Sequence, residues 1–226
     1  MYITYLSSEQ KENSSSYLYV FIHGFKLNSG TWQDIPKQLL ESNPTSSIAL
    51  VDIEEKDYLL SVPELSSLII QELNKKEIEE KREVIFIGHS LGCFPILSII
   101  SSSSFPCKKV FLIDSPVKNE LYYEYLVKQT LLPGNNEIDH ARLQNYDLLP
   151  EIEQISSSVS IWIHMRMEPD ASAEQIEILL GRMKWLSQLT TLNEKSRLFV
   201  NCNVSHFIHQ DIPKIILSNI QLLTNY

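Results

Sequence analysis

Apolar residues in this chain gather in short continuous runs, separated by longer segments in which an apolar residue recurs every three or four positions. The runs are rich in β-branched and aromatic residues. Several are apolar at consecutive positions, which is typical of strands buried on both faces. Six strands are therefore predicted, at residues 17–23, 47–53, 83–88, 109–114, 159–165 and 197–202.

The segments between these runs have the spacing of amphipathic helices. Helices are predicted at residues 31–41, 62–81, 91–102, 171–189 and 212–223. Strands that alternate with helices are typical of an α/β fold, with a mostly parallel central sheet and helices on both of its faces. The segment YITYLS near the amino terminus predicts one further strand, antiparallel, at the edge of that sheet.

One connection, residues 115–158, is longer than an ordinary crossover and is divided by a Pro-Gly-Asn-Asn turn. Its first part carries three closely spaced tyrosines, Tyr122, Tyr123 and Tyr125. We expect one domain over residues 1–226, with 115–158 as a short helical lid that places these tyrosines at a substrate pocket. The alternative is a packing excursion with no role at the site.

Charge and composition argue against several classes of partner. The chain has a formal net charge of -9 and no basic run longer than two residues, so nucleic acid and anionic membranes are poor partners. No apolar run reaches the ~20 residues that span a bilayer. The amino terminus lacks the pattern of a signal peptide, so we expect no membrane span and a cytoplasmic protein.

Neither a disulfide framework nor a metal site is expected. The three cysteines, Cys93, Cys107 and Cys202, have no metal-ligand spacing, and their odd number argues against a set of disulfides. We expect them to be buried, unpaired thiols. The six histidines are scattered, so no metal and no organic cofactor is predicted.

The candidate chemistry begins with the segment GHSLG, residues 88–92, which follows a predicted strand and precedes a predicted helix. In this context Gly-x-Ser-x-Gly is typical of a sharp turn that exposes a nucleophilic serine. The small glycines let the strand and the helix approach each other. Ser90 is therefore the candidate nucleophile.

Two backbone N–H groups are predicted to bind the oxyanion of a tetrahedral intermediate. The N–H of Leu91 lies at the start of the helix that follows Ser90, where amides point toward an anion. The segment HGF ends the first parallel strand, and its turn would present the N–H of Phe25 as the second donor. His23, in the same segment, is interpreted as a residue that shapes the loop.

A serine nucleophile needs a general base, and in the strand-turn-helix context of GHSLG this is a histidine later in the chain. His140 falls inside the long connection and His164 inside a predicted strand, so neither suits the role. His206 comes just after the last strand and before the final helix, where a base would reach the serine. His206 is therefore the candidate base, and His209 is interpreted as a partly exposed residue at a helix start.

A carboxylate must orient the base, and three candidates remain open. Asp170 follows the strand at 159–165 beside a helix start and is preferred, although it has an alternative role as the N-cap of that helix. Asp114 ends the preceding strand and is the main alternative. Its other candidate role is to cap a turn before Pro116. Glu168 is the third candidate.

In these motifs the chain resembles the α/β-hydrolase superfamily from Tyr17 onward. HGF looks like the family's oxyanion loop, GHSLG like its nucleophile elbow, and SHFIHQDIP like its histidine loop before the last helix. The resemblance implies that Ser90 is the nucleophile and His206 the base, with Phe25 and Leu91 as the oxyanion donors.

The resemblance also bears on the acid and on the activity. The segment MEPD looks like the family's acid-bearing turn, which favours Asp170, while some members carry the acid one strand earlier, where Asp114 stands. A serine at the elbow implies an acyl-enzyme and a carboxylesterase-like activity, with thioesters and lactones as related substrates. The apolar, tyrosine-bearing connection favours a small or medium hydrophobic acyl group.

Two other classes of function remain open at this point. A non-catalytic ligand-binding protein can be built on the same fold, since a fold does not determine a function. A lyase or cofactor-free oxidase can reuse the same three residues, and only the identity of the product separates it from a hydrolase. The oligomeric state has no signature in the sequence.

Overall fold

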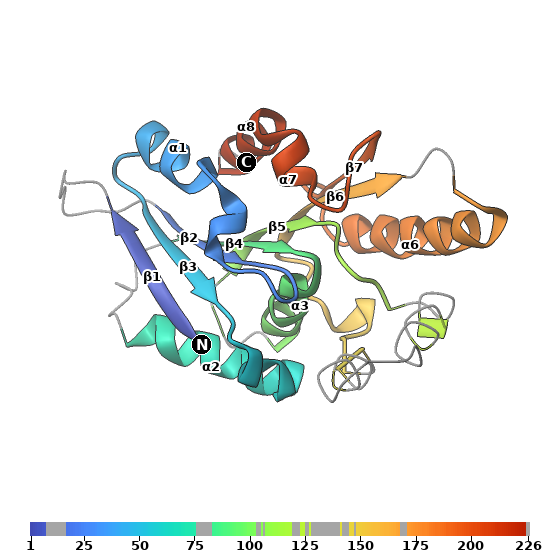
Figure 1. Ribbon diagram of the computed structural model, residues 1–226, viewed down its shortest axis with the longest axis horizontal. Helices are drawn as coiled ribbons and strands as arrows, with labels where there is room; N and C mark the ends of the chain where they lie inside the picture. Colours follow the sequence, from blue (N-terminus) through green and yellow to red (C-terminus); the bar gives the residue numbers. More distant parts are fainter. Residues whose placement is uncertain are drawn as a thin grey trace.

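One seven-stranded sheet forms the centre of the protein (Figure 1). The computed structural model describes residues 1–7, 17–75, 83–102, 105, 107–118, 123–124, 127, 141, 145–146, 148–167 and 171–224. The strands are β1 (Tyr2–Ser7), β2 (Tyr17–Ile22), β3 (Ser47–Asp52), β4 (Glu83–His89), β5 (Cys107–Ile113), β6 (Ser160–Met167) and β7 (Arg197–Cys202). They lie in the order β1-β3-β2-β4-β5-β6-β7, with β1 antiparallel to β3 and the other neighbouring pairs parallel.

Helices connect the parallel strands. They are α1 (Ile35–Ser42), α2 (Val62–Asn74), α3 (Cys93–Ser102), α6 (Ala173–Thr191), α7 (Ile208–Asp211) and α8 (Pro213–Thr224), with short 3-10 helices η1 (Ser29–Trp32), η2 (Glu55–Leu59), η3 (Ser90–Gly92) and η4 (Ile152–Gln154). The predicted α/β class is confirmed, including the antiparallel edge strand. The helix predicted at 62–81 is described only as far as the end of α2, because residues 76–82 lie outside the described part of the chain.

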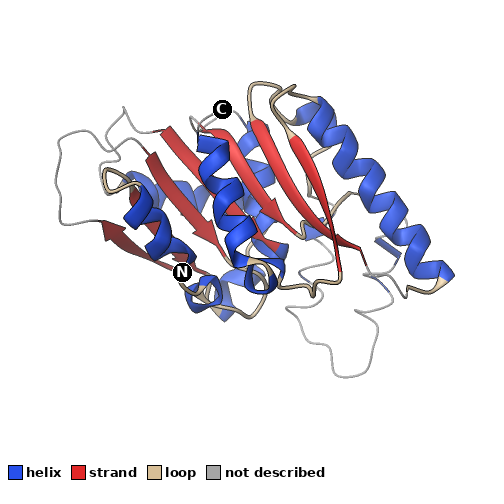
Figure 2. Ribbon diagram, turned by 90° about the horizontal axis from the view of Figure 1, so that it is seen from above, coloured by secondary structure: helices blue, strands red, loops and turns tan. Residues whose placement is uncertain are grey.

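Helices cover both faces of the sheet because successive strand residues point to opposite sides. On β2, Leu18, Val20 and Ile22 belong to the core under α2, α3 and α6. Tyr19 and Phe21 of the same strand belong to the core under α1 and α8. Figure 1 shows α1 and α8 on one side of the sheet and α2 and α3 on the other, and Figure 2 shows the twisted strands between the layers.

The two long helices begin with the same local signal. Ser61 accepts the N–H of Glu64 at 3.4 Å, and the Glu64 carboxylate accepts the N–H of Ser61 at 2.8 Å, so α2 opens with a reciprocal cap. Ser172 and Gln175 form the same cap for α6. Ser172 is therefore the N-cap of that helix, which corrects the alternative role considered for Asp170.

The long connection is described only in part. Asn145 accepts the N–H of Val62 at 2.8 Å and donates to the carbonyl of Leu60 at 3.0 Å, which ties the connection to the start of α2. The ring of Tyr123 lies 5.2 Å from that of Tyr146, which is buried. Tyr122, Tyr125 and most of the predicted lid lie outside the described residues, so the lid and its pocket stay a prediction.

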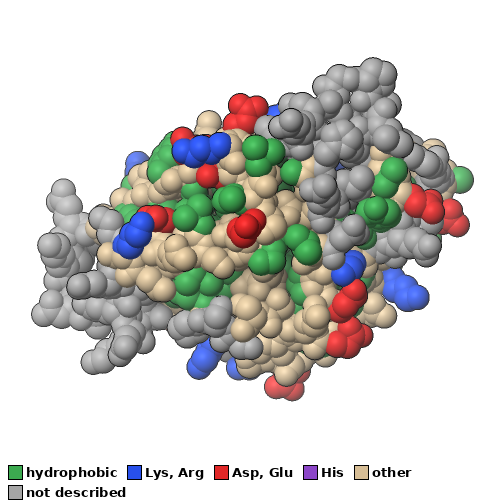
Figure 3. Space-filling model, turned by 90° about the horizontal axis from the view of Figure 1, so that it is seen from below, with side chains coloured by type: hydrophobic (Ala, Val, Ile, Leu, Met, Phe, Trp, Pro, Cys, Tyr) green, Lys and Arg blue, Asp and Glu red, His purple; other side chains and the backbone are tan. Residues whose placement is uncertain are grey.

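The surface carries charges of both signs. On the face shown in Figure 3, acidic and basic side chains are mixed with apolar ones. Among the described residues, no helix has both the length and the apolar character needed to cross a membrane. Cys93 and Cys107 are buried, but Cys202 is exposed at the end of β7, so the prediction that all three thiols are buried is wrong for Cys202.

Candidate active site

The carboxyl ends of the parallel strands meet at one edge of the sheet, and the predicted site residues follow those ends. Gly24 comes after β2, Ser90 after β4, Asp114 after β5 and His206 after β7. Because these strands are neighbours or near neighbours in the sheet, segments more than a hundred residues apart in the chain meet there.

The turn at Ser90 is tight and conformationally strained. Ser90 has φ 51°, in the left-handed region that residues other than glycine rarely adopt. A Cβ on Gly88 would lie 2.6 Å from the Ile96 side chain, and one on Gly92 would lie 2.3 Å from the carbonyl oxygen of Ile22. The two glycines are thus required by close packing of β4 on α3 and of the elbow on the end of β2.

Replacing Gly92 with alanine is expected to destabilise the fold by about 3 kcal/mol, which is near the upper end of the usual cost of adding atoms to a packed core. The added Cβ would meet backbone oxygens of Ile22 and His23, at 2.3 and 2.4 Å, and these belong to the end of a central strand. Thermal unfolding followed by circular dichroism should show a melting temperature lower by roughly 6–12 °C.

The matched control is Gly30→Ala, where the added Cβ would meet only a rotatable side-chain oxygen of Asn28, at 2.9 Å. That variant should melt within a few degrees of the wild type. Equal melting temperatures for Gly92→Ala and Gly30→Ala would show that the elbow does not need the close approach.

The loop after β2 lies directly against the elbow. A Cβ on Gly24 would be 3.2 Å from the Cβ of Ser90. The Tyr58 hydroxyl accepts the N–H of Lys26 at 3.1 Å and donates to the carbonyl of Gly24 at 3.3 Å, and the Phe25 ring packs edge-on against Tyr58. These contacts hold the backbone at Phe25 beside Ser90, which supports the predicted role of its N–H.

His23 joins the ends of two strands. Its Nδ1–H donates to the carbonyl of Gly24 at 2.7 Å, and its Nε2 accepts the N–H of Ile53 at 3.0 Å. The side chain is buried, and burial lowers the pKa of His23. Both ring nitrogens are therefore occupied in a neutral imidazole that shapes the loop.

A histidine and a carboxylate meet at this edge. His206 Nδ1 lies 2.6 Å from Asp114 Oδ2, a distance typical of a charge-assisted hydrogen bond in which the imidazole donates. The His206 side chain is 38% exposed and that of Asp114 is 2% exposed, so the ring is partly open to solvent while the carboxylate is buried. Asp170 and Glu168 lie outside the described residues; within the described part of the chain, the carboxylate hydrogen-bonded to His206 is that of Asp114.

Two arginines also bind Asp114. Arg166 Nε donates to its Oδ2 at 3.0 Å, and Arg182 Nη2 donates to its Oδ1 at 2.9 Å. Burial alone would raise the pKa of the Asp114 carboxyl, but the hydrogen bond from His206 and the charges of Arg182, His206 and Arg166 hold it well below its usual range. Asp114 is therefore ionised at neutral pH.

His89, the residue before Ser90, is hydrogen-bonded to the backbone of His206. Its Nε2 donates to the carbonyl of His206 at 2.9 Å, and the two ring centroids are 4.7 Å apart. Burial and the neighbouring charges of His209 and His206 lower the pKa of His89 to about 3, so it is neutral. Among the described residues, no hydrogen bond joins the Ser90 hydroxyl to His206; the His89 contact links the backbone of His206 to the elbow.

His209 is buried, so the prediction of a partly exposed residue is wrong. Its Nε2 is hydrogen-bonded to Thr31 Oγ1 at 3.2 Å, and its ring packs 4.8 Å from that of Trp32. Burial lowers the pKa of His209 to about 4. The side chain of His209, on the short helix α7, points into the core, where aromatic rings surround it.

Comparison with known proteins gives a match at the level of structure. No protein-family model matches the chain, and no curated protein matches its sequence. A carboxylesterase from Nitrososphaera gargenis superposes with a TM-score of 0.69 at 12% identity, covering 99% of this chain and 95% of its own. A monoacylglycerol lipase from Paleococcus ferrophilus has a TM-score of 0.67 at 11% identity, and the match covers 99% of this chain and 98% of the lipase. An enol-lactonase from Burkholderia xenovorans LB400 has a TM-score of 0.65 at 11% identity, and the match covers 99% of this chain and 96% of the lactonase. The chain has the α/β-hydrolase fold.

Three residues of the site on this α/β-hydrolase fold were missed by sequence reasoning. Arg182 had a usable signal, because it lies three and four positions before Trp185 and Leu186 on the buried face of α6. A charged residue on such a face needs a buried partner. Arg166 and His89 had no comparable signal, since a strand end and the middle position of the GHSLG turn tolerate many side chains.

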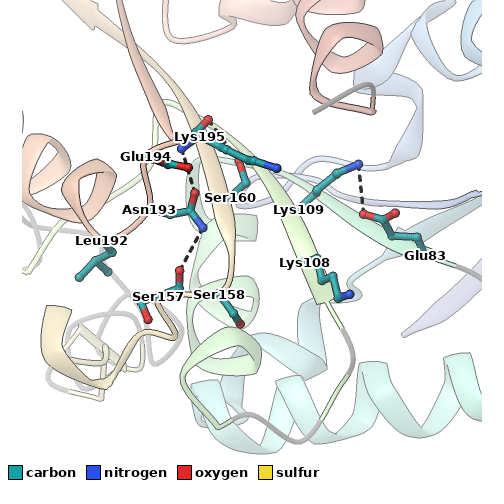
Figure 4. Close-up of a pocket in the computed structure, with 10 residues that line it drawn as sticks. All are labelled: Glu83, Lys108, Lys109, Ser157, Ser158, Ser160, Leu192, Asn193, Glu194 and Lys195. Atoms are coloured by element: carbon teal, nitrogen blue, oxygen red, sulfur yellow. Dashed lines mark hydrogen bonds and ion pairs between the residues drawn. The ribbon is translucent and has the colours of Figure 1, made fainter.

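A separate cavity of about 560 Å³ lies at the opposite edge of the α/β-hydrolase sheet, where the parallel strands begin (Figure 4). Its polar groups bind one another: Lys109 pairs with Glu83 at 3.1 Å, and Asn193 donates to the carbonyl of Ser157 at 3.0 Å. Among the described residues, no group of three or more His, Cys, Asp or Glu side chains is placed to hold a metal. The candidate site residues lie at the other edge of the sheet, away from this cavity.

Proposed function

We propose that this protein is a serine hydrolase that cleaves carboxylic esters through an acyl-enzyme on Ser90. The observation that carries the proposal is the 2.6 Å bond between His206 and the buried Asp114, at the same sheet edge as the strained Ser90 turn. Solved structures that share the fold are described as a carboxylesterase, a lipase and a lactonase, which supports ester chemistry for this chain.

His206 is the proposed general base. Its Nδ1–H donates to Asp114, which leaves Nε2 unprotonated and able to accept a proton from the Ser90 hydroxyl. Ser90 Oγ then attacks the ester carbonyl, and the imidazolium returns the proton to the leaving alcohol. A water molecule, activated by the same ring, hydrolyses the acyl-enzyme and restores Ser90.

The backbone N–H groups of Phe25 and Leu91 are the proposed oxyanion donors. The close approach of Gly24, the residue before Phe25, to Ser90 supports the first donor, and the position of Leu91 directly after Ser90 in η3 supports the second. Donors fixed in this way need no reorganisation as charge develops on the carbonyl oxygen.

A small or medium hydrophobic acyl group is the proposed substrate. Phe25 and Leu91 are partly exposed apolar side chains close to Ser90 along the chain or through Gly24, and both pack against the core under α2 and α3. The partly exposed ring of Phe207 lies 5.6 Å from that of His89. Thioesters and lactones share the reacting carbonyl and are the related substrates.

A fluorophosphonate probe tests the nucleophile directly. The wild-type protein is expected to form one covalent adduct, located by mass spectrometry on the peptide that contains Ser90, because an activated serine displaces fluoride from phosphorus. The same preparation should hydrolyse p-nitrophenyl esters, and the acyl chain length with the highest kcat/KM would size the pocket.

If neither an adduct nor ester turnover is observed, the proposal is contradicted. That result would favour the alternative of a non-catalytic ligand-binding protein on this fold. An adduct at Ser90 with products other than acid and alcohol would favour the lyase or oxidase alternative. An adduct on a different serine would remove Ser90 from the mechanism.

A further inference from the structure

The backbone carbonyl of Gly24 accepts hydrogen bonds from three donors. His23 Nδ1–H donates to it at 2.7 Å, the N–H of Leu27 at 3.3 Å and the Tyr58 hydroxyl at 3.3 Å. A carbonyl oxygen has two lone pairs, and one bond is enough to satisfy it in a helix or a sheet. Three donors on one carbonyl therefore do more than close a loop.

The peptide group of this carbonyl also carries the N–H of Phe25. The peptide bond is trans, so the C=O and the N–H of this group point in opposite directions. Fixing the direction of the Gly24 carbonyl therefore fixes the direction of the Phe25 N–H. Hydrogen bonds to a carbonyl also polarise its peptide group, which makes the N–H of that group a stronger donor.

We infer that His23 and Tyr58 are positioning residues that fix and polarise the Gly24–Phe25 peptide, so that its N–H is a strong donor already set for the oxyanion. The effect on the reaction rate rests on the proposed function. The effect on the peptide group does not, because it follows from the contacts of the Gly24 carbonyl.

The geometry around His23 leaves one tautomer. The N–H of Ile53 donates to Nε2 at 3.0 Å, so Nε2 is an unprotonated acceptor and Nδ1 carries the proton that is donated to Gly24. His23 follows β2 and Ile53 follows its neighbour β3, so the ring is anchored to the end of a second strand. His23 is 1% exposed, and water does not compete for either nitrogen.

Tyr58 reaches the same loop from η2. Its hydroxyl donates to the carbonyl of Gly24 and accepts the N–H of Lys26 at 3.1 Å, so it bonds the peptide groups on both sides of Phe25. The rings of Phe25 and Tyr58 pack edge-on with their centroids 4.9 Å apart. Lys26 has φ 54°, in the left-handed region, and the bond from Leu27 to Gly24 closes the turn around it.

The test compares His23→Asn with His23→Gln. The side-chain nitrogen of asparagine can take the place of Nδ1 and keep the bond to Gly24, whereas the side-chain oxygen of glutamine can take the place of Nε2 and keep only the bond from Ile53. We expect kcat for ester hydrolysis to fall by about 10–50-fold in His23→Gln, less than the 10²–10³-fold typical when an oxyanion donor is deleted, because the Phe25 N–H remains. His23→Asn should stay within about threefold of the wild type, and KM should change little in both variants, because the oxyanion forms only in the transition state.

Tyr58→Phe is a second variant, which keeps the ring against Phe25 and removes the hydroxyl. Its kcat should fall by about 5–20-fold, since one of the donors to Gly24 is lost. Tyr19→Phe is the matched control: it removes a buried hydroxyl, bonded to Asn43, from the opposite face of the sheet. The kcat of the control should stay within about twofold of the wild type, because Tyr19 has no contact with the loop after β2.

A second measurement does not depend on turnover. Gly24–Phe25 is the one Gly-Phe pair in the sequence, so protein labelled with ¹³C at glycine carbonyls and ¹⁵N at phenylalanine gives a single carbonyl-to-amide NMR correlation from this peptide. Loss of a donor to the carbonyl should move its ¹³C and ¹⁵N resonances upfield in His23→Gln and Tyr58→Phe. They should stay near the wild-type positions in His23→Asn and Tyr19→Phe.

Unmoved resonances in both His23→Gln and Tyr58→Phe would overturn the inference, whatever the reaction rates. Equal losses of kcat in His23→Asn and His23→Gln, with the resonances unmoved in His23→Asn, would indicate a purely structural histidine and would overturn it too. Absence of ester turnover in the wild type, with the expected shifts present, would reject the proposed function and support the account of the peptide.

Discussion

Ser90→Ala is expected to lower kcat for ester hydrolysis by about 10⁴-fold or more, as is typical when a serine nucleophile that acts with a histidine is removed. The residual rate would come from the backbone donors and from substrate binding. KM should change little, because the hydroxyl contributes mainly to the transition state. Initial rates on the preferred p-nitrophenyl ester measure both constants, with Ser67→Ala as the matched control on the outer face of α2.

The same position allows a check on folding. Alanine keeps the unfavourable φ of 51° and should leave the melting temperature close to that of the wild type. Ser90→Gly removes the strain and should stabilise the protein by roughly 0.5–1 kcal/mol while remaining inactive. Substantial activity in either variant would refute the acyl-enzyme mechanism.

Asp114→Asn is expected to lower kcat by about 10³–10⁴-fold, since an amide does not hold the productive tautomer of His206 or stabilise its protonated form. Asp170→Asn is the matched comparison, because Asp170 is the carboxylate preferred from the sequence. It should cost less than tenfold. A large loss in Asp170→Asn with near-normal activity in Asp114→Asn would reverse the assignment of the acid.

Asp114→Asn should also reduce stability. It breaks the buried ion pair between Asp114 and Arg182, and removing one member of a buried pair typically costs about 3–5 kcal/mol. The lowered pKa of Asp114 means that its stabilising effect is fully present above about pH 4, the usual range for an aspartate, and is lost as the pH falls below that value. Urea unfolding at pH 7 and below pH 4 should therefore show a smaller acid-dependent loss in the variant than in the wild type.

The strands were predictable because they are buried on both faces. A segment such as VIFIG has no polar residue to accommodate, so its continuous apolar run is read correctly without knowledge of its neighbours. The elbow was predictable because its glycines answer a local steric demand between β4 and α3. Each of these two signals, the apolar run and the pair of glycines, is contained within a few consecutive residues.

The carboxylate partner of His206 was not predictable in this way. Asp114 and Asp170 follow adjacent parallel strands, β5 and β6, and the carboxyl ends of adjacent strands lie close together. A helix start next to one of them favoured Asp170, whereas the observed bond to His206 depends on the direction in which a buried carboxylate points. Arg166 and Arg182 are hydrogen-bonded to that carboxylate, and they come from segments 52 and 68 residues away.

By itself, then, the sequence determined the α/β class, the succession of strands and helices, and the place of the GHSLG turn, because each depends on local periodicity or on contacts between near neighbours in the chain. Only the tertiary structure decided which carboxylate meets His206, that His209 is buried, and that two arginines surround Asp114. These facts depend on distances between side chains of different strands and helices. Such distances exist only once the sheet has brought its carboxyl ends together.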